Sequence, residues 1–467
     1  MGAHMSSSTD KILARIDADL GEAEQRLIGW LRIPSISAQP AHAADCRAAA
    51  EYARADLASL DFDVRIAETG GHPVVIGHHP GPGGDVPHLL YYGHYDVQPA
   101  DPLELWKTPP FEPTMVEGPH GRRIVARGAV DAKGQTEMWL GAFRAYHRET
   151  GTLPCRVTVL IEGEEEVGSL NLAAFVAKHA DELRADIVVI SDTNMWDIAT
   201  PAITARLRGM VNMQVDLHGP SRDLHSGLYG GSALNPINAL ATVLGQLKDA
   251  EGRVQIPGFY DGIAEVSAAQ AKQWEALGFD EQRFLGDIGL SVPYGEAGRG
   301  ALERIWARPT ADVNGIWGGY QGEGAKTVIP ADAGAKISFR LVPGQDPARI
   351  RAGFEAFVRA RIPADARVDF SFFGGGPGIE IPTDNRFVRE AAAALHDEYG
   401  RVPAMIGSGG SIPVVETFKR ELGLDTLLMG FGLEDDQVHS PNEKFEMTCL
   451  HKGMRSHARL LARLAPG

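Results

Sequence analysis

The stretch His88-Leu-Leu-Tyr-Tyr-Gly-His-Tyr-Asp96 decides how the chain is expected to fold. It opens with a short apolar run, which is typical of a strand that is buried on both faces of a parallel sheet. It then reaches His94 and Asp96, two side chains of types that bind metal ions. In open parallel sheets, ligands bind beyond the carboxyl ends of the strands. We therefore predict a buried strand that delivers polar side chains to a functional edge.

Similar apolar segments alternate along the chain with segments of helical periodicity. The further expected strands are Arg156–Ile161, Asp186–Ile190 and Asp425–Gly430, and the expected helices are Lys133–Arg148, Asn171–His179 and Asn385–Tyr399. An amphipathic helix that starts at Thr9 and Asp10 precedes them, because apolar residues recur at helical spacing from Ile12 to Leu31. This alternation predicts an α/β fold with a mostly parallel sheet and helices on both of its faces.

The middle of the chain has a different pattern. The segments Arg208–Leu217, Ala335–Leu341 and Arg367–Phe373 alternate between polar and apolar residues, and Asp346–Ile362 has helical spacing. Alternation of this kind is typical of strands with one face in water. We predict a smaller α+β domain at 205–382, inserted between the two parts, 6–204 and 383–467, of the α/β domain.

Composition narrows the class of protein. The chain has 467 residues, 44% hydrophobic and 23% charged, as in ordinary globular proteins of two or three domains. Its formal net charge of −16 repels nucleic-acid phosphates and anionic lipids. No apolar run approaches the ~18 residues that span a bilayer, no signal-peptide pattern is present, and three cysteines are too few for a disulfide framework. We expect a cytoplasmic protein that binds neither nucleic acid nor membranes.

Potential metal ligands follow each expected strand of the α/β domain. They are His94 and Asp96, Glu164 to Glu166, Asp192 and His439, and Asp131 precedes an expected helix. Two imidazoles with several carboxylates and no thiolate suit zinc, manganese or cobalt. A bridging carboxylate allows two ions roughly 3.5–4 Å apart, as in hydrolases that activate water, while one glutamate stays off the metal as the base. The pattern predicts a hydrolytic metal site.

Each of these residues also has an ordinary structural explanation when it is taken alone. A histidine after a strand usually forms a loop hydrogen bond, and three successive glutamates usually form a solvated charge run. Asp131 alone is a candidate helix cap, and Asp192 alone is a candidate turn residue. Their joint occurrence at strand ends favours the metal site.

With these motifs the sequence resembles the dinuclear zinc metallopeptidase family of carboxypeptidase G, aminoacylase-1 and the carnosine and cytosolic nonspecific dipeptidases. The matching strings are Gly93-His-Tyr-Asp-Val-Gln-Pro99, Arg127-Gly-Ala-Val-Asp-Ala-Lys-Gly134, Glu162-Gly-Glu-Glu-Glu-Val-Gly-Ser169, Ser191-Asp192 and His439-Ser-Pro-Asn-Glu443. The dipeptidase branch is the most similar, through Asp223-Leu-His-Ser-Gly-Leu-Tyr-Gly-Gly231, Lys326-Thr-Val-Ile-Pro330, Ser338-Phe-Arg-Leu-Val-Pro343 and Gly409-Gly-Ser-Ile-Pro413.

The resemblance implies a role for each matching residue. It implies two metal ions: His94 and Asp192 on one, Glu166 and His439 on the other, and Asp131 bridging both. It also implies that Asp96 orients His94 and that Glu165 is the general base, which leaves Glu164 as a solvated residue without a role.

The inserted domain is implied to be a lid that also joins two subunits into a homodimer. His225 is then contributed in trans and polarises the scissile carbonyl or stabilises the oxyanion. Arg340 is implied to hold the terminal carboxylate of the substrate, and Thr327 and Ser411 to add hydrogen bonds at that end.

The resemblance implies metal-dependent hydrolysis of dipeptides. One departure is Phe373-Gly-Gly-Gly-Pro377, where the dipeptidase branch has a histidine before Gly-Gly-Lys, so general dipeptide hydrolysis is favoured over carnosine-like specificity. The alternative is an N-acyl-amino-acid amidohydrolase or carboxypeptidase on the same metal site. A nucleotide-dependent oxidoreductase is excluded because Ile412 stands at the third glycine position of the nearest glycine motif, and a serine hydrolase because Gly-x-Ser-x-Gly is incomplete around Ser411. Glu165 argues against a non-catalytic metal-binding protein.

Overall fold

The computed structural model describes residues 2–465 of the chain, with side chains described from residue 8. The chain divides into two compact units. Within the described residues, the first comprises 2–205, 381–406 and 413–465, and the second comprises 206–380 and 407–412. The assignment of segment 407–412 to the second unit differs from the boundaries predicted from the sequence, which placed this segment in the α/β domain. Its Gly409 carbonyl accepts a hydrogen bond of 3.0 Å from Arg208 Nε, which attaches the segment to the second unit.

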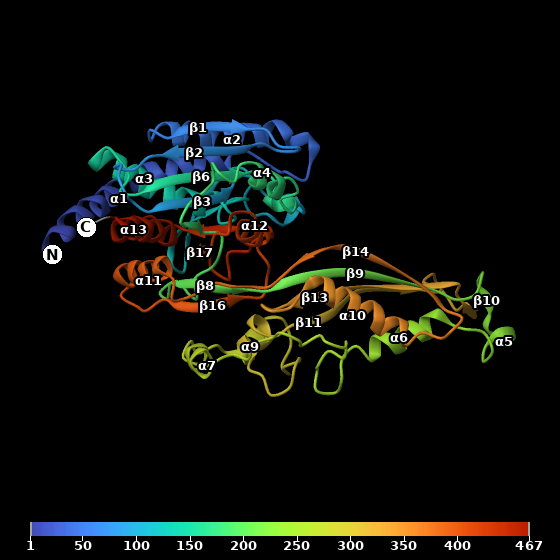
Figure 1. Cartoon of the computed structure of the whole chain (residues 1–467). Helices are drawn as coiled ribbons and strands as arrows, with labels where there is room; N and C mark the ends of the chain where they lie inside the picture. The colour runs from blue at the N-terminus through green and yellow to red at the C-terminus, as the bar shows by residue number, and fades with distance from the viewer. Residues whose placement is uncertain (1, 466–467) are drawn as a thin grey trace. The chain divides into compact units, whose positions relative to one another are not determined.

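The first unit is built on a six-stranded sheet (Figure 1). In spatial order its strands are β1 (Asp63–Ala67), β2 (Val74–His79), β6 (Arg156–Glu162), β3 (His88–His94), β7 (Ile187–Ile190) and β17 (Thr426–Leu428). The last four strands run parallel to one another, and β2 runs antiparallel to both of its neighbours, β1 and β6. The predicted α/β class, the mostly parallel sheet and all four predicted strands are confirmed.

Two neighbouring tyrosines show that helices cover both faces of this sheet. Tyr91 and Tyr92 of β3 point to opposite faces because successive strand residues alternate. The ring of Tyr91 packs against Trp139 of α3 (Lys133–Thr150) at 5.5 Å, and that of Tyr92 packs against Phe418 of α12 (Pro413–Leu422) at 5.5 Å. The core therefore lies on both sides of β3, and both tyrosines are fully buried.

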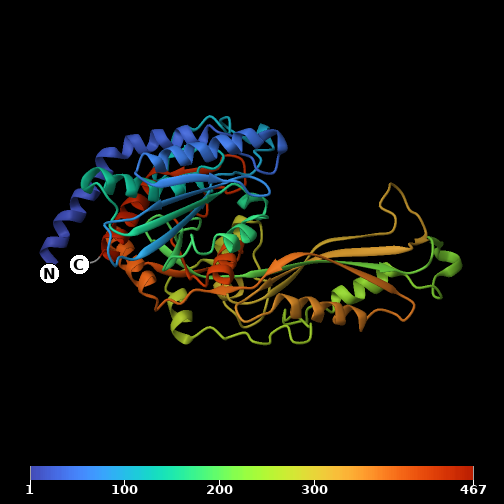
Figure 2. The same ribbon diagram turned by 45° about the horizontal axis from the view of Figure 1, so that its top comes forward.

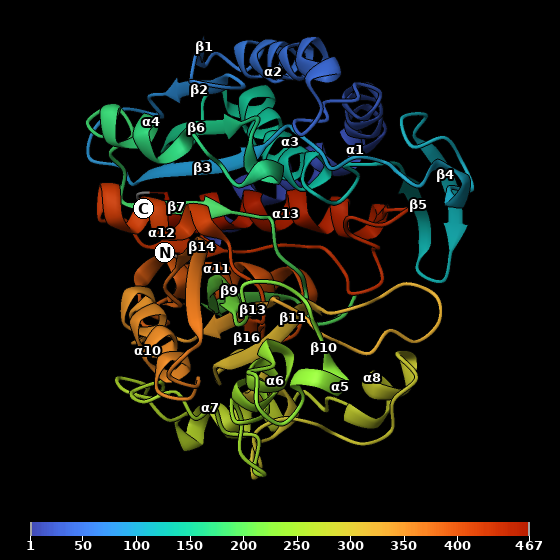
Figure 3. The ribbon, with the colours of Figure 1, turned by 90° about the vertical axis from the view of Figure 1, so that its right-hand side faces the viewer.

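The remaining elements of the first unit surround this sheet. They are α1 (Gly2–Leu31), α2 (Ala43–Ala58), β4 (Thr114–Gly118), β5 (Gly121–Val125), α4 (Leu172–Lys178), α11 (Arg386–Tyr399), β18 (Lys444–Glu446) and α13 (Met447–Leu464), with 3-10 turns at Pro40–His42, Leu103–Leu105 and Glu165–Val167. Helix α1 begins before Thr9, where the sequence placed its start. Helices α1 and α2 lie side by side (Figure 2), and Trp30 is stacked on Tyr52 at 6.0 Å. Strands β4 and β5 form a hairpin (Figure 3), and β5 pairs with β18.

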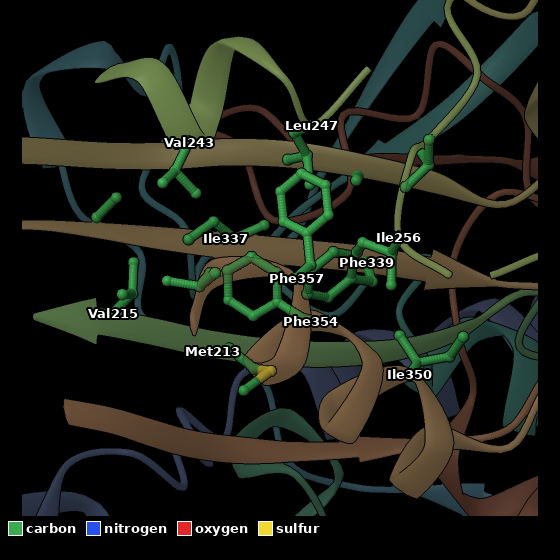
Figure 4. Packing of buried hydrophobic residues seen from close by; sticks show 14 of the residues in the cluster. Met213, Val215, Val243, Leu247, Ile256, Ile337, Phe339, Ile350, Phe354 and Phe357 are labelled. Carbon is green, nitrogen blue, oxygen red and sulfur yellow. The ribbon is translucent and has the colours of Figure 1, made fainter. Parts of the chain in front are cut away.

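The second unit is built on a four-stranded antiparallel sheet. Its strands, in spatial order, are β11 (Thr310–Gly318), β13 (Asp332–Leu341), β9 (Gly209–His218) and β14 (Arg367–Gly376). Helices α6 (Pro236–Gly245) and α10 (Pro347–Arg359) cover one face, and Phe339, Phe354 and Phe357 lie in the core between sheet and helices (Figure 4). The three predicted strands and the predicted helix of this region are confirmed.

Shorter elements complete the second unit. They are β10 (Leu224–His225), α5 (Ser226–Tyr229), α7 (Ala268–Glu275), α8 (Glu281–Asp287), α9 (Ala301–Trp306), β12 (Val328–Ile329) and β15 (Ile379–Glu380), while the chain passes between units within β8 (Ala202–Leu207) and β16 (Ala404–Ser408). Strands β10 and β12 form a two-stranded antiparallel sheet. Among the described helices of the chain, none is long and apolar enough to cross a membrane.

Candidate metal centre and substrate residues

Three of the predicted ligands meet beyond the carboxyl end of β3. His94 ends this strand, Asp192 follows β7, and Asp131 lies just before α3. Each offers one ligand atom within 4.8 Å of the others. His94 Nε2 lies 3.2 Å from Asp131 Oδ1 and 3.5 Å from Asp192 Oδ2. The parallel sheet therefore gathers side chains that are almost 100 residues apart in sequence.

A second group shares Asp131 with the first. It consists of Asp131, Glu166 and His439, again with one ligand atom each within 4.8 Å. His439 Nε2 lies 2.9 Å from Asp131 Oδ2 and 3.1 Å from Glu166 Oε2. Asp131 turns one carboxylate oxygen to each histidine, so the geometry is that of two adjoining ligand sets with one bridging carboxylate.

The donor atoms suit divalent cations. His94 is fully buried, and its Nε2 atom has no hydrogen-bond partner although two carboxylates lie beside it. Ligands about 2.0–2.2 Å from a tetrahedral zinc ion lie roughly 3.3 Å apart, close to the spacing of these nitrogen and oxygen atoms. An imidazole that is buried without a partner and faces carboxylates fits a cation between them.

The shifted pKa values of the candidate ligands also favour a bound cation. Hydrogen bonds to Asp131 and Glu166 raise the pKa of His439 to about 10. Burial raises the pKa of Asp192 and of Glu166, and the negative charge of Asp131 raises both further. Burial by itself would lower the pKa of His94, but the surrounding carboxylates raise it well above its usual value. Cations at this place would neutralise the carboxylates and displace the protons from both histidines.

Asp96 holds the ligand loops together. His94 Nδ1 is 3.0 Å from the backbone carbonyl of Asp96 and 3.4 Å from its carboxylate oxygen Oδ1. The same carboxylate accepts the backbone N–H groups of Glu165 and Glu166 at 3.3 and 3.1 Å. Asp96 thus contacts His94 mainly through its carbonyl, and it joins the end of β3 to the Glu165–Val167 turn.

Glu165 lies beside the two ligand groups but is a member of neither. Burial raises the pKa of its carboxyl well above the usual value, and the charges of Asp192, Glu166 and Asp131 add to this effect. A carboxyl group that is free of the ligand sets and has a raised affinity for protons is suited to proton transfer.

The expectation that Glu164 is solvated is wrong. Its side chain is buried, with 7% of its surface exposed, and its carboxylate accepts hydrogen bonds of 2.8 and 3.1 Å from Asn171 Nδ2. Gly71 makes room for it, since a Cβ atom there would meet Glu164 Oε1 at 1.8 Å. Because Glu164 stands in a run of three glutamates, its burial could not be recognised from the sequence. It joins its turn to the start of α4.

Sequence reasoning missed Glu443. Its Oε2 atom accepts hydrogen bonds from Arg127 Nη1 at 2.7 Å and from the Gly128 N–H at 3.0 Å. Its Oε1 atom accepts the N–H groups of Val130 and Asp131 at 3.0 and 3.2 Å. The side chain is fully buried, which raises its pKa to about 7. Glu443 therefore holds the loop that presents Asp131, and its place four residues after His439 was the available signal.

The remaining predicted residues all lie in the second unit. His225 is exposed and its Nδ1 atom accepts the Gly227 N–H at 2.9 Å, which leaves Nε2 to carry the proton and to donate it outwards. Thr327 is also exposed, and its carbonyl accepts the N–H of Ser226 at 3.0 Å. His225 ends β10, and Thr327 immediately precedes β12, the strand that pairs with β10, so the two residues are neighbours.

Arg340 and Ser411 form a second pair in this unit. Arg340 Nη1 donates to Ser411 Oγ at 3.3 Å. Both side chains are half-buried. Among the described residues no carboxylate forms an ion pair with Arg340, so its guanidinium keeps donors for a ligand.

Comparison with known proteins identifies the family. The sequence matches Peptidase family M20/M25/M40 over residues 90–463. The Cys-Gly metallodipeptidase DUG1 of Candida albicans is 32% identical over 454 residues, covering 92% of this chain and 92% of that protein. The Beta-Ala-His dipeptidase of Homo sapiens is 30% identical over 482 residues, covering 98% of this chain and 92% of that protein.

Solved structures agree with the sequence comparisons. The structure of the di-peptidase Dug1p from Saccharomyces cerevisiae has a TM-score of 0.79 at 28% identity and covers 98% of both chains. The M20 family metallo-carboxypeptidase Sso-CP2 from Sulfolobus solfataricus has a TM-score of 0.80 at 30% identity, covering 95% of this chain and 99% of that chain. The chain therefore belongs to Peptidase family M20/M25/M40 and is a metallopeptidase of the dipeptidase type, as its sequence predicted.

Proposed function

We propose that this protein hydrolyses the peptide bond of dipeptides with two divalent ions held by its own side chains. The observation that carries the proposal is Asp131, whose two carboxylate oxygens face the two histidines His94 and His439. Zinc is the favoured ion, with manganese or cobalt as alternatives, because the donors are imidazoles and carboxylates without a thiolate. The names of the Cys-Gly and Beta-Ala-His dipeptidase relatives support dipeptides as the substrate class.

The chain's own residues supply proton transfer. When bound, a pair of divalent ions polarises a carbonyl and makes a water molecule acidic. Glu165 then takes the proton of the attacking water and delivers it to the leaving amine, a role suited to a carboxyl group outside both ligand sets. Asp96 positions Glu165 by accepting its backbone N–H.

The second unit supplies substrate contacts. Arg340 binds the C-terminal carboxylate of the dipeptide in bidentate fashion, and Ser411 adds a hydrogen bond. His225 donates a hydrogen bond from its Nε2–H group to the carbonyl oxygen as negative charge develops there. Thr327 accompanies His225, since it immediately precedes β12, the strand that pairs with the strand of His225.

The assembly is part of the proposal. Residues 205–382 serve as a lid and as the contact of a homodimer, and each subunit contributes His225 to the site of the other. Exposure of His225 within its own unit is consistent with a role toward a second chain. A cytoplasmic location stays a prediction from the sequence.

The test is amine release from free dipeptides, their N-acetylated counterparts and tripeptides, with protein that has been stripped by a chelator and reloaded with zinc or manganese. We expect metal-dependent cleavage of the free dipeptides alone. Sso-CP2, a metallo-carboxypeptidase that is 30% identical to this chain, makes cleavage of longer peptides the second candidate. Preference for acetylated substrates would mean that the protein is an amidohydrolase. Preference for longer peptides would mean that it is a carboxypeptidase. No cleavage in any metal-loaded sample would contradict all of these activities.

A further inference from the structure

Arg208 and Arg340 lie on the same face of the sheet of the second unit. Arg340 of β13 is opposite Met210 of β9, and Arg208 comes two residues before Met210. Burial alternates along this stretch, with Gly209 and Val211 buried and Arg208 and Met210 partly exposed. Arg208 and Arg340 are therefore diagonal neighbours across two strands, a distance that long side chains reach.

Both guanidinium groups also meet the loop 407–412. Arg340 Nη1 donates to Ser411 Oγ at 3.3 Å, and Arg208 Nε donates to the Gly409 carbonyl at 3.0 Å. Gly409 leaves space for this approach, because a Cβ atom there would lie 3.0 Å from Arg208 Nη2. One loop thus holds two cationic side chains beside a hydroxyl group.

The positive charge of Arg208 and Arg340 is only partly balanced by the surrounding protein. Within the part of the chain that the structure describes, neither Arg208 nor Arg340 forms an ion pair. The nearby Arg308 is neutralised by Glu296 at 2.7 Å. The carboxylate of Asp312 is paired with a lysine at 3.3 Å, and its charge offsets part of the charge of Arg208 without forming an ion pair with it. Burial lowers the pKa of Arg208 to about 10, and the charge of Arg340 contributes to the shift. Two unpaired guanidinium groups in a half-desolvated place favour an anionic ligand.

We propose that Arg208 supplies a second cation to the site in which Arg340 and Ser411 hold the terminal carboxylate, so that the enzyme selects dipeptides with aspartate or glutamate at the C-terminal position. This inference rests on the proposed function of Arg340. One carboxylate pairs fully with one planar guanidinium and leaves the other unpaired. A C-terminal residue with an acidic side chain brings a second carboxylate and neutralises both arginines.

The test compares Ala-Glu with Ala-Gln, which have nearly the same shape and differ in one charge. For the metal-loaded wild-type enzyme we expect kcat/KM to be roughly ten-fold higher for Ala-Glu, mainly through KM, as for one charged hydrogen bond. Arg208→Gln should bring the ratio close to 1, and Arg208→Lys should retain most of it. Arg206→Gln is the matched control, since Arg206 lies two residues away, is paired with Glu380, and should leave the ratio unchanged.

Two results would overturn the proposal. One is a wild-type ratio of 1 or less. The other is a fall in the rates of both substrates by the same factor in Arg208→Gln and in Arg208→Lys, which would mean that Arg208 only holds the Gly409 loop.

Failure of the proposed dipeptidase activity gives a different result, because then neither dipeptide is cleaved. Calorimetric titration of the protein with free glutamate and free glutamine decides the proposal in that case. Tighter binding of glutamate that is lost in Arg208→Gln would support it. Equal binding of the two amino acids would overturn it.

Discussion

The Nε2 atom of His439 lies 2.9 Å from the Oδ2 atom of Asp131. The other oxygen of the same carboxylate lies 3.2 Å from His94 Nε2. His439 follows the last strand of the sheet in sequence, and His94 ends its central strand. One aspartate on the loop before α3 thus joins two histidines that are 345 positions apart in the chain numbering, which is the arrangement expected of a bridging ligand.

Removing the bridge should remove both ions. Asp131→Asn keeps the size of the side chain but removes its charge, and a neutral amide is a poor bridging ligand. We expect loss of bound metal from both positions and at least a ~100-fold fall in turnover. Elemental analysis of the dialysed protein measures this directly. Asp181→Asn, at a fully exposed aspartate, is the control and should keep both ions. Full metal content in Asp131→Asn would refute the bridging role.

Replacing Glu165, the proposed base, should lower turnover without loss of bound metal. Glu165 lies outside both ligand groups, so Glu165→Gln should bind as much metal as the wild type. Turnover should fall at least ~100-fold, because the amide cannot accept the proton of the attacking water. Steady-state kinetics beside elemental analysis checks both expectations. A near-normal turnover would refute the assignment of Glu165.

A role of His225 in trans can be tested with mixed dimers. His225→Ala and Glu165→Ala should each be inactive alone. Mixing them should restore part of the activity, since a hybrid dimer contains one site with both residues intact. Activity is measured after subunit exchange has been demonstrated with differently tagged chains. If exchange occurs without any recovery, His225 acts within its own chain or has no catalytic role.

Glu443 should control both stability and metal binding. Glu443→Gln leaves Arg127 buried without its carboxylate partner, and the new amide N–H2 group faces N–H donors instead of accepting from them. Breaking a buried ion pair typically costs about 3–5 kcal/mol of unfolding free energy. We expect a loss of this order in denaturant unfolding of the metal-free protein, with weaker binding of metal at Asp131. Glu434→Gln, on an exposed loop, is the control. Unchanged metal affinity would show that the Asp131 loop does not need Glu443.

The pH dependence of the free energy of unfolding should show that His457 is buried in its neutral form. This side chain is fully buried, which lowers its pKa to about 3, whereas an unfolded chain has a value near 6.5. Between these values the unfolded state binds the extra proton, so stability falls as the pH drops from about 6.5 towards about 3. The expected loss from this group is about 1.4 kcal/mol per pH unit. Denaturant unfolding of wild-type protein and His457→Gln at pH 7.5 and 5 checks it, and the variant should lose less. Equal losses would contradict the buried neutral state.

Much of the metal centre could be predicted because its residues follow strands. The apolar runs that end at Tyr92 and Ile190 fix the places of His94 and Asp192, since parallel strands end at a common edge. The roles of Glu164 and Glu443 could not be predicted in this way. Glu164 is held by a hydrogen bond from Asn171, and Glu443 by one from Arg127. Both glutamates lie in loops, where no periodicity marks an inward-facing side chain, and Arg127 is distant from Glu443 in sequence.

The second unit was harder to predict for a related reason. Alternating residues indicated which strand segments exist, but not which strands are neighbours in the sheet. The proximity of Arg208 to Arg340 follows from the pairing of β9 with β13, and the contact with Ser411 depends on a loop from a distant part of the sequence. Long-range pairing of this kind has no local signal.

The most direct test of the central claim is a metal titration of activity. Chelator-stripped protein is supplied with increasing amounts of zinc or manganese, and cleavage of a free dipeptide is measured beside the bound metal per chain. The two ligand groups that share Asp131 predict that activity requires metal and reaches its maximum at two ions per chain. Full activity at one ion per chain, or activity in the stripped protein, would contradict the account.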